Sequence, residues 1–157
     1  MPGPDGWLDS AGMHVLRGEL AATFPQAEIS EFQWSSYGSA ASEIAKATPT
    51  DKIVVIGYSG GGSRATWMVS ERPKLRVDLM VLYDPSPTWQ MKSIAGSGVK
   101  HCVCYHNKSP FFLGLGGGEA MGDPGQIEVI DVSENHMVVQ ADQSLHDKTI
   151  KEIAKIV

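Results

Sequence analysis

The chain has 157 residues, the size of one domain, and we predict a single domain over 1–157. Hydrophobic residues make up 42% and charged residues 20%, which is ordinary for a globular protein and excludes a disordered one. The net charge of −5 argues against nucleic acid or an anionic membrane as a partner. No apolar run has the length of a membrane span and residues 1–7 lack a signal-peptide pattern, so we expect a cytoplasmic protein.

The predicted elements alternate between helices and short apolar strands. Apolar residues recur at spacings of three and four between Gly12 and Phe24, the pattern of an amphipathic helix. The segment 52–57 is β-branched without polar alternation, which is typical of a strand buried on both faces. In chain order we predict a helix at 12–24, a strand at 27–34, a helix at 39–47, a strand at 52–57, a helix at 61–71, a strand at 77–83, a short helix at 88–95, a strand at 99–105, a loop at 107–125, a strand at 126–132, and a helical stretch at 137–157 that breaks near His146.

This alternation predicts an α/β fold. We expect a doubly wound, mostly parallel sheet of about five strands with helices on both faces. In sheets of this kind, ligands bind at the carboxyl ends of the strands. The residues that directly follow each strand are therefore the candidate site residues.

Ser59 follows one of these strands, in the segment Gly57–Gly61. In the nucleophile-elbow motif Gly-x-Ser-x-Gly, the serine sits on a strained turn between a strand and a helix, which lifts its hydroxyl above the sheet edge. The flanking glycines are expected because a side chain there would collide with the neighbouring helix or strand. The amide of the next residue, Gly60, is free to bind an oxyanion. We predict that Ser59 is a catalytic nucleophile.

Two further polar residues follow strands later in the chain. Asp84 comes directly after the strand at 77–83, and His136 follows the strand at 126–132. The order serine, aspartate, histidine is that of one type of catalytic triad. Asp123, in the glycine-rich loop, is an alternative acid. His146 is an alternative base, although we interpret it as a surface residue.

These motifs resemble the α/β-hydrolase family, in a reduced form without a lid or cap domain. The resemblance runs from the helix at Gly12 to the C-terminal helix and is sharpest at Gly57–Gly61 and at His136. It implies that Ser59 is the nucleophile, that His136 is the general base and acid, and that Asp84 orients the imidazole.

The chain departs from the family pattern in two places. The commoner position of the acid corresponds here to 106–109, which holds no carboxylate, so Asp84 lies one strand earlier. The family also has a strand before the first helix, and the loop after that strand supplies a second oxyanion donor. Residues 1–11 contain no apolar run, and we assign the second donor to the amides around Asp5, Gly6 and Trp7.

Other residues are candidates for packing or for substrate contact. Aromatic side chains near strand ends or in the long loop could line an acyl pocket: Tyr58, Trp89, Phe111 and Phe112. Cys102, Cys104 and His106 share one strand face, but no fourth ligand is near, so we predict core packing and no metal. The two cysteines are expected to be reduced, which fits a cytosolic setting.

The sequence therefore predicts a serine hydrolase that cleaves a small carboxylic ester or thioester and needs no cofactor. An acyltransferase with the same triad is an alternative, because the sequence does not specify the acceptor. A non-catalytic binding protein on a hydrolase scaffold is a second alternative, since the second oxyanion donor is weakly specified. The oligomeric state is left open.

Overall fold

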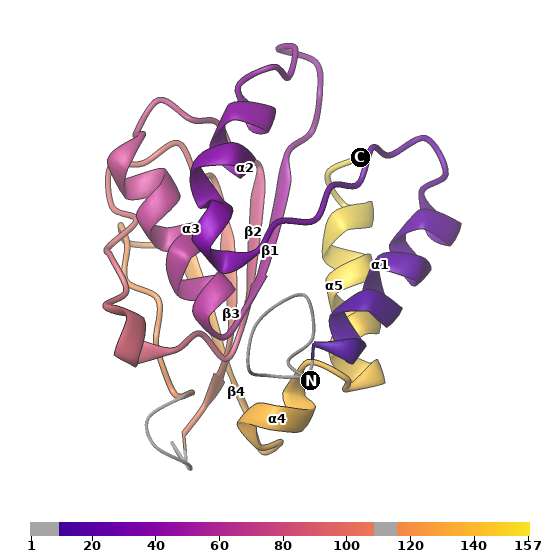
Figure 1. Cartoon of the computed structure of the whole chain (residues 1–157), viewed down its shortest axis with the longest axis vertical. Coiled ribbons are helices and arrows are strands. Elements are labelled where there is room, and N and C mark those ends of the chain that lie inside the picture. The colour runs from indigo at the N-terminus through magenta and orange to yellow at the C-terminus, as the bar shows by residue number, and fades with distance from the viewer. Residues whose placement is uncertain (1–9, 109–115) are drawn as a thin grey trace.

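The computed structural model describes residues 10–108 and 116–157, apart from the side chain of Trp89. Four parallel strands form its central sheet in the order β1-β2-β3-β4 (Figure 1). Their bounds are β1 Val54–Tyr58, β2 Leu79–Tyr83, β3 Cys102–Asn107 and β4 Ile127–Val132. Because all four strands run the same way, their carboxyl ends meet at one edge of the sheet.

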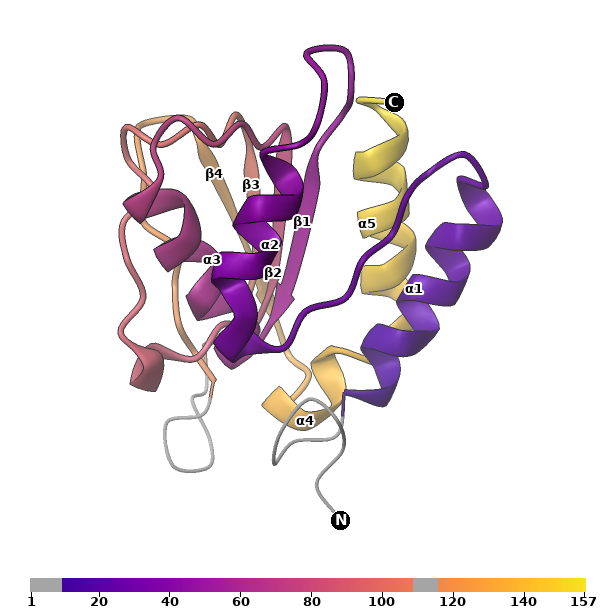
Figure 2. The same cartoon turned by 45° about the horizontal axis from the view of Figure 1, so that its top comes forward.

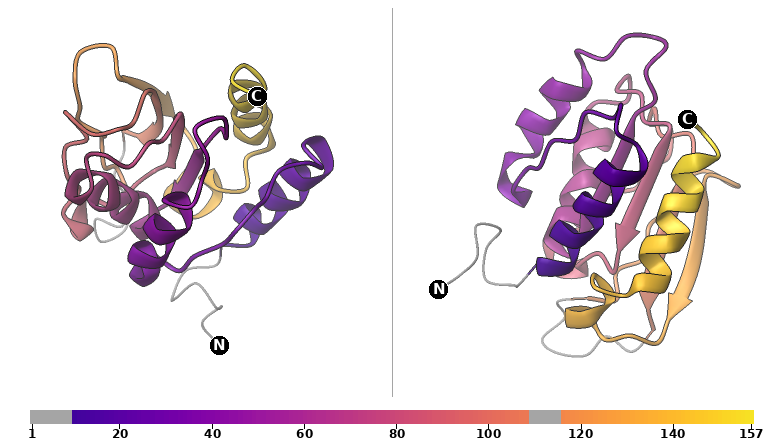
Figure 3. Two further views of the ribbon diagram at one scale, coloured as in Figure 1. Left: turned by 90° about the horizontal axis from the view of Figure 1, so that it is seen from above. Right: turned by 90° about the vertical axis from the view of Figure 1, so that its right-hand side faces the viewer.

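Helices cover both faces of the sheet, as Figures 1 and 3 show. On one face lie α2 (Tyr37–Ile44) and α3 (Gly60–Glu71). On the other lie α1 (Ala11–Thr23) and α5 (Gln143–Ala154), preceded by the short α4 (His136–Val139). Two 3₁₀ turns, η1 (Trp34–Ser36) and η2 (Pro87–Trp89), join these elements. The predicted α/β class is confirmed.

The sequence of β2 is apolar throughout because both faces of this strand are buried. Met80 and Leu82 point into the core beneath α3, whereas Leu79, Val81 and Tyr83 point into the core beneath α1 and α5. Successive side chains of a strand point to opposite faces, and both faces of β2 are covered. All five residues are therefore buried.

The prediction of about five strands is wrong by one, because the described residues form four strands. The expected strand at 27–34 is absent. Residues 27–33 instead run between α1 and α2 without regular structure, and most of them are exposed (Figure 2). Phe32 is 42% exposed, whereas Ile29 is partly buried and packs against the core beneath α1 and α5. Ile29, Phe32 and Trp34 alternate with polar residues and so predict a strand. A strand needs a hydrogen-bonded neighbour, however, and the described chain supplies none there.

The winding of the sheet also differs from the prediction. The four strands are added in one direction, without the reversal of order that defines a doubly wound sheet. The second face is covered because α1 precedes the strands and α5 follows them. The carboxyl edge thus contains no switch point among the described strands, and the site is built from the turns themselves.

One predicted helix is shorter than expected, and the predicted break in the C-terminal helical stretch is present. The expected helix at 88–95 shrinks to η2, because Gln90 takes a left-handed conformation with φ of 50° and ends it. The C-terminal stretch breaks before His146, between α4 and α5. There the side chain of Asp142 accepts hydrogen bonds from the amides of Ser144 and Leu145 and starts a new helix. None of the helices in the described part of the chain has both the length and the apolar composition that a membrane crossing requires.

Candidate active site

Three predicted residues meet at the carboxyl edge of the sheet. Ser59 follows β1, Asp84 follows β2, and His136 is the first residue of α4, beyond β4. The Oγ atom of Ser59 lies 2.9 Å from Nε2 of His136. Nδ1 of the same ring lies 2.7 Å from Oδ2 of Asp84. These are hydrogen-bond distances, so the three side chains form one connected chain.

The backbone at Ser59 is strained in the way that an elbow requires. Its φ is 52° and its ψ is −124°, a conformation that L-residues rarely adopt. The surrounding structure holds it there. The amide of Ser59 donates to the carbonyl of Tyr83 at 3.1 Å, and its own carbonyl accepts from the amides of Ser63 and Ser86 at 3.1 and 3.2 Å. The hydroxyl is thus fixed above the end of β1.

The glycines around Ser59 have unequal roles. A Cβ on Gly57 would lie 2.7 Å from the Cα of Gly62, so the strand and the helix can approach only because both positions lack side chains. Gly61 has open space around it, with nothing within 4 Å of an added Cβ. The prediction that both flanking glycines prevent a collision is therefore right for Gly57 and wrong for Gly61. The second close-packed glycine is Gly62, because the first turn of α3 places it against β1.

Asp84 is fully buried, and both oxygens of its carboxylate accept hydrogen bonds from protein groups. Oδ1 accepts hydrogen bonds from the amides of Asn107 at 3.2 Å and Gly117 at 2.7 Å. Its φ of 41° is also in the left-handed region, so two of the three triad residues have strained backbones. A side chain on Gly116 would collide with both the Asp84 carboxylate and the His136 imidazole. The chain at 116–117 therefore packs directly over the pair and keeps it dry.

This geometry fixes the proton on the imidazole. Oδ2 of the Asp84 carboxylate can only accept, so Nδ1 of His136 carries hydrogen and donates. Nε2 is then left with a lone pair, and the Ser59 hydroxyl donates to it. Exposed fractions of 5% for Ser59, 0% for Asp84 and 4% for His136 keep these hydrogen bonds away from bulk water. The arrangement can remove a proton from Ser59 and hold the resulting imidazolium beside a carboxylate.

The loop that carries His136 is held by residues that the sequence analysis missed. Nδ2 of Asn107 donates to the carbonyl of Glu134 at 2.9 Å, and the side chain of Asn135 caps α4. Asn107 ends β3 and was thus open to detection by the strand-end rule. An amide side chain cannot replace the carboxylate of a triad acid, so its residue type alone does not mark Asn107 as part of the site. Nothing in the sequence marks Gly116 and Gly117 among the other glycines of their loop.

The two alternative triad residues do not meet Ser59. Asp123 accepts a hydrogen bond from the amide of Gly96 at 2.8 Å and serves a turn. His146 lies on α5 with Nδ1 3.0 Å from Oε2 of Glu19 and Nε2 donating to the carbonyl of Gln140 at 2.8 Å. Its interpretation as a surface residue is wrong, because it is 1% exposed between α1 and α5.

Only some of the residues predicted to bind the oxyanion or the substrate lie within the described part of the chain. Gly60 is the first residue of α3 and is buried beside Ser59. Its amide has no partner within the helix, as is general for the first residues of a helix. Tyr58 lies against His136, with ring centroids 5.2 Å apart. The remaining candidates fall outside the described residues: Gly6, Trp7, Phe111, Phe112 and the side chain of Trp89.

The cysteines belong to the core, as predicted. Cys102 and Cys104 are free and buried. Burial raises the pKa of the Cys104 thiol to about 11 and raises that of Cys102 still further, so neither is a ready nucleophile. His106 pairs instead with Asp131, Nδ1 to Oδ1 at 3.1 Å. Within 10–108 and 116–157, no three His, Cys, Asp or Glu side chains come together in a way that could hold a metal ion.

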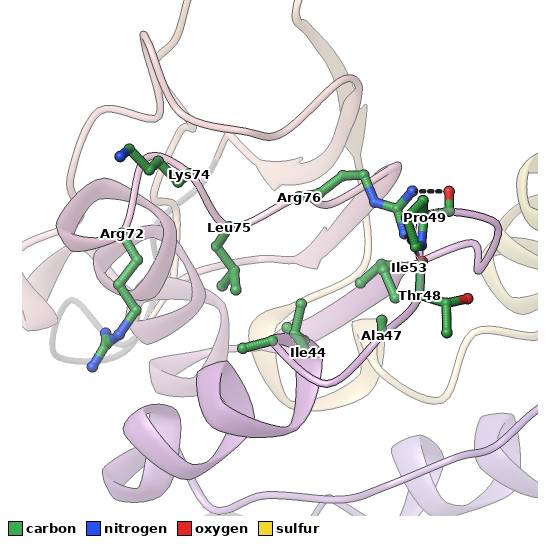
Figure 4. A pocket seen from close by; sticks show the side chains of 10 residues that line it. Ile44, Ala47, Thr48, Pro49, Ile53, Arg72, Lys74, Leu75 and Arg76 are labelled. Carbon is green, nitrogen blue, oxygen red and sulfur yellow. Dashed lines mark hydrogen bonds between the residues drawn. The ribbon is translucent and has the colours of Figure 1, made fainter.

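A cavity of about 570 Å³ lies at the other end of the sheet (Figure 4). Ile44, Ile53 and Leu75 line its apolar part, and Arg72, Lys74 and Arg76 supply positive charge. The Arg76 guanidinium is already engaged, since it donates to the carbonyls of Thr48, Pro49 and Asp51. None of the triad residues lines this cavity.

Comparison with known proteins gives no match. No family model matches the chain, and no curated protein and no solved structure matches it either. The chemistry of this site therefore follows from the geometry of its own residues.

Proposed function

We propose that this protein is a serine hydrolase that cleaves a carboxylic ester or thioester of a small molecule through an acyl-enzyme on Ser59. The observation that carries the proposal is the connected chain from Ser59 Oγ to His136 Nε2, 2.9 Å, and from His136 Nδ1 to Asp84 Oδ2, 2.7 Å. The strained elbow supports it as well, because such strain is costly and persists where a site requires it.

The reaction uses each residue in turn. Ser59 Oγ attacks the carbonyl carbon while His136 Nε2 takes its proton, and the Asp84 carboxylate stabilises the imidazolium. The Gly60 amide donates to the oxyanion of the tetrahedral intermediate. The intermediate collapses, the carbon–oxygen or carbon–sulfur bond breaks, and His136 returns the proton to the leaving alcohol or thiol. Water, deprotonated by His136, then releases the acid from Ser59 by the same steps.

We further propose a reduced form of the α/β-hydrolase fold for this chain. The support is the strand–elbow–helix unit from β1 to α3, the order Ser59, Asp84, His136, and the position of each residue after a strand. The buried, free cysteines support a reducing compartment such as the cytoplasm. The high thiol pKa values also favour serine over cysteine as the nucleophile.

Turnover of p-nitrophenyl acetate and butyrate by the wild type and by Ser59→Ala tests the proposal. We expect hydrolysis by the wild type and a loss of about 10³-fold or more in Ser59→Ala, because the covalent route is removed. Equal rates in the two proteins would contradict it. Adding an alcohol to the assay separates hydrolysis from acyl transfer, since a transferase would form the new ester in preference to the free acid.

A further inference from the structure

Tyr58 makes two separate contacts with the candidate base. Its hydroxyl donates to the backbone carbonyl of His136 at 2.9 Å, across 78 residues of chain. Its ring also stacks on the imidazole, with centroids 5.2 Å apart and planes 28° from parallel. One side chain therefore holds both the main chain and the ring of His136.

We propose that Tyr58 is a positioning residue for His136. The sequence had indicated that Tyr58 lines the acyl pocket, and the positioning role replaces that one. This inference rests on the proposed function, because it assigns a role within the same triad. Tyr58 packs with the core cluster beneath α1 and α5, which includes Val139 of α4. Its side chain is thus directed toward the element that carries the base.

His136 needs such support because its own helix is weak. The helix α4 has four residues, and its local stabilisation is the cap from Asn135. A single helical turn has little stability of its own and depends on tertiary contacts. The hydroxyl of Tyr58 binds the carbonyl of His136, the first residue of this turn, and so fixes the main chain from which the imidazole extends.

The position of Tyr58 in the sequence adds to this effect. It is the last residue of β1 and directly precedes Ser59, and β1 is paired with β2 along its whole length. The anchor of the base is therefore the last residue of a paired strand, and the nucleophile is the next residue along the chain. Motions of the loop before α4 do not separate Nε2 from Oγ as long as the Tyr58 hydroxyl remains bound.

The stacked ring has a second consequence during the reaction. When His136 takes the proton of Ser59, the imidazole becomes a cation. The face of an aromatic ring attracts a cation electrostatically, and the attraction is stronger where water is excluded. The Tyr58 ring therefore stabilises the imidazolium that forms when His136 takes the proton of Ser59.

Two substitutions separate these contacts. Tyr58→Phe keeps the ring and removes the hydroxyl, whereas Tyr58→Leu removes both. We expect kcat for p-nitrophenyl esters to fall about fivefold in Tyr58→Phe, the rate equivalent of one hydrogen bond. We expect a fall of about thirtyfold in Tyr58→Leu, because the aromatic contact is lost too. KM and the ratio of acetate to butyrate rates should stay at the wild-type values in both.

Tyr105→Phe is the matched control. It removes a buried tyrosine hydroxyl that lies 3.3 Å from Oγ1 of Thr149, away from the triad. This variant should lose thermal stability and keep kcat, so it shows what a purely structural tyrosine does. Thermal unfolding of all variants confirms that rates are compared between folded proteins.

Two outcomes overturn the role of Tyr58. A changed KM or ester preference with an unchanged kcat makes Tyr58 a substrate contact, and a lowered melting temperature with an unchanged kcat makes it a packing residue like Tyr105. Failure of the proposed function looks different. In that case the wild type itself neither hydrolyses the esters nor reacts with a fluorophosphonate.

Discussion

Two buried aspartates stand at the two ends of β2, and they show how the same side chain serves different purposes. Asp78 precedes the strand and is 5% exposed, and Asp84 follows it and is 0% exposed. Oδ1 of Asp78 pairs with Nζ of Lys100 at 2.6 Å, and Oδ2 accepts from the amide of Ile53 at 2.9 Å. Asp84 pairs instead with an imidazole and two amides.

The partner decides what each carboxylate can do. Lys100 donates to Asp78 from just before β3 and Ile53 donates from just before β1, so Asp78 ties the starts of these strands to that of β2. An imidazole can gain and lose a proton, and the second nitrogen of His136 faces the hydroxyl of Ser59. The backbone differs as well, since Asp84 has a φ of 41° and Asp78 is not among the described residues with positive φ. The end of the strand with the positive φ carries the proposed active site, and the other end carries an ion pair.

The largest effect predicted from this comparison is on kcat. Asp84→Asn should lower kcat by about 10⁴-fold, because the amide of Asn can donate to Nδ1 and so favours the wrong tautomer of His136. Asp78→Asn, at the other end of the same strand, should leave kcat unchanged. Steady-state ester kinetics on both variants measure this. Similar losses of kcat in Asp84→Asn and Asp78→Asn would contradict the distinction between the two ends of β2.

An intermediate effect is expected from the glycines of the elbow. Gly57→Ala should lower the free energy of unfolding by about 1–3 kcal/mol, because its Cβ would press on Gly62 and cannot be relieved by a rotamer change. Gly61→Ala meets open space and should be neutral or stabilise α3 by up to about 1 kcal/mol. Urea unfolding of the pair gives both values. A destabilised Gly61→Ala with an unaffected Gly57→Ala would contradict the packing described for the elbow.

The smallest effect concerns the pH dependence of stability at the structural end. Burial acts to raise the pKa of Asp78, but the hydrogen bonds and charges around it outweigh burial and hold the pKa below its ordinary value. Those contacts come mainly from Lys100 and from the amide of Ile53. A lowered pKa means that Asp78 stabilises the fold above its unfolded pKa of about 3.9, and that this contribution is lost as the pH falls through the folded value.

Unfolding free energies at pH 7, 5 and 3 measure this contribution. The difference between the wild type and Asp78→Asn should be largest at pH 7 and shrink toward pH 3. The kcat of Asp78→Asn should equal that of the wild type at pH 7. A difference in unfolding free energy that grows toward low pH would contradict the lowered pKa of Asp78.

Much of the fold was predictable because its core strands are dense in apolar residues. The segments 52–57, 77–83, 99–105 and 126–132 each overlap an observed strand, although β1 and β3 run past the predicted ends to Tyr58 and Asn107. The segment 27–34 instead places its apolar residues between polar ones, and it forms no strand. Pairing depends on which neighbour is present at that edge of the sheet, and a local pattern carries no information about the neighbour. For the same reason, the order of winding could not be derived.

The three main residues of the site were predictable because each of them follows a strand. Ser59, Asp84 and His136 were found by that rule, and the structure brings them together. Apart from Asn107 at the end of β3, the supporting contacts were not predictable, because they use backbone atoms and close approaches. The Gly117 amide on Asp84 and the missing side chain of Gly116 depend on how a long loop returns to the sheet.

The most direct test of an activated Ser59 is labelling of the folded protein by a fluorophosphonate, read by peptide mass spectrometry. This probe reacts with serines whose hydroxyl is activated by a neighbouring base. We predict one adduct, on the peptide that contains Ser59, and its loss in both Ser59→Ala and His136→Ala. An unlabelled wild type, or labelling that survives in His136→Ala at the wild-type rate, would contradict the account.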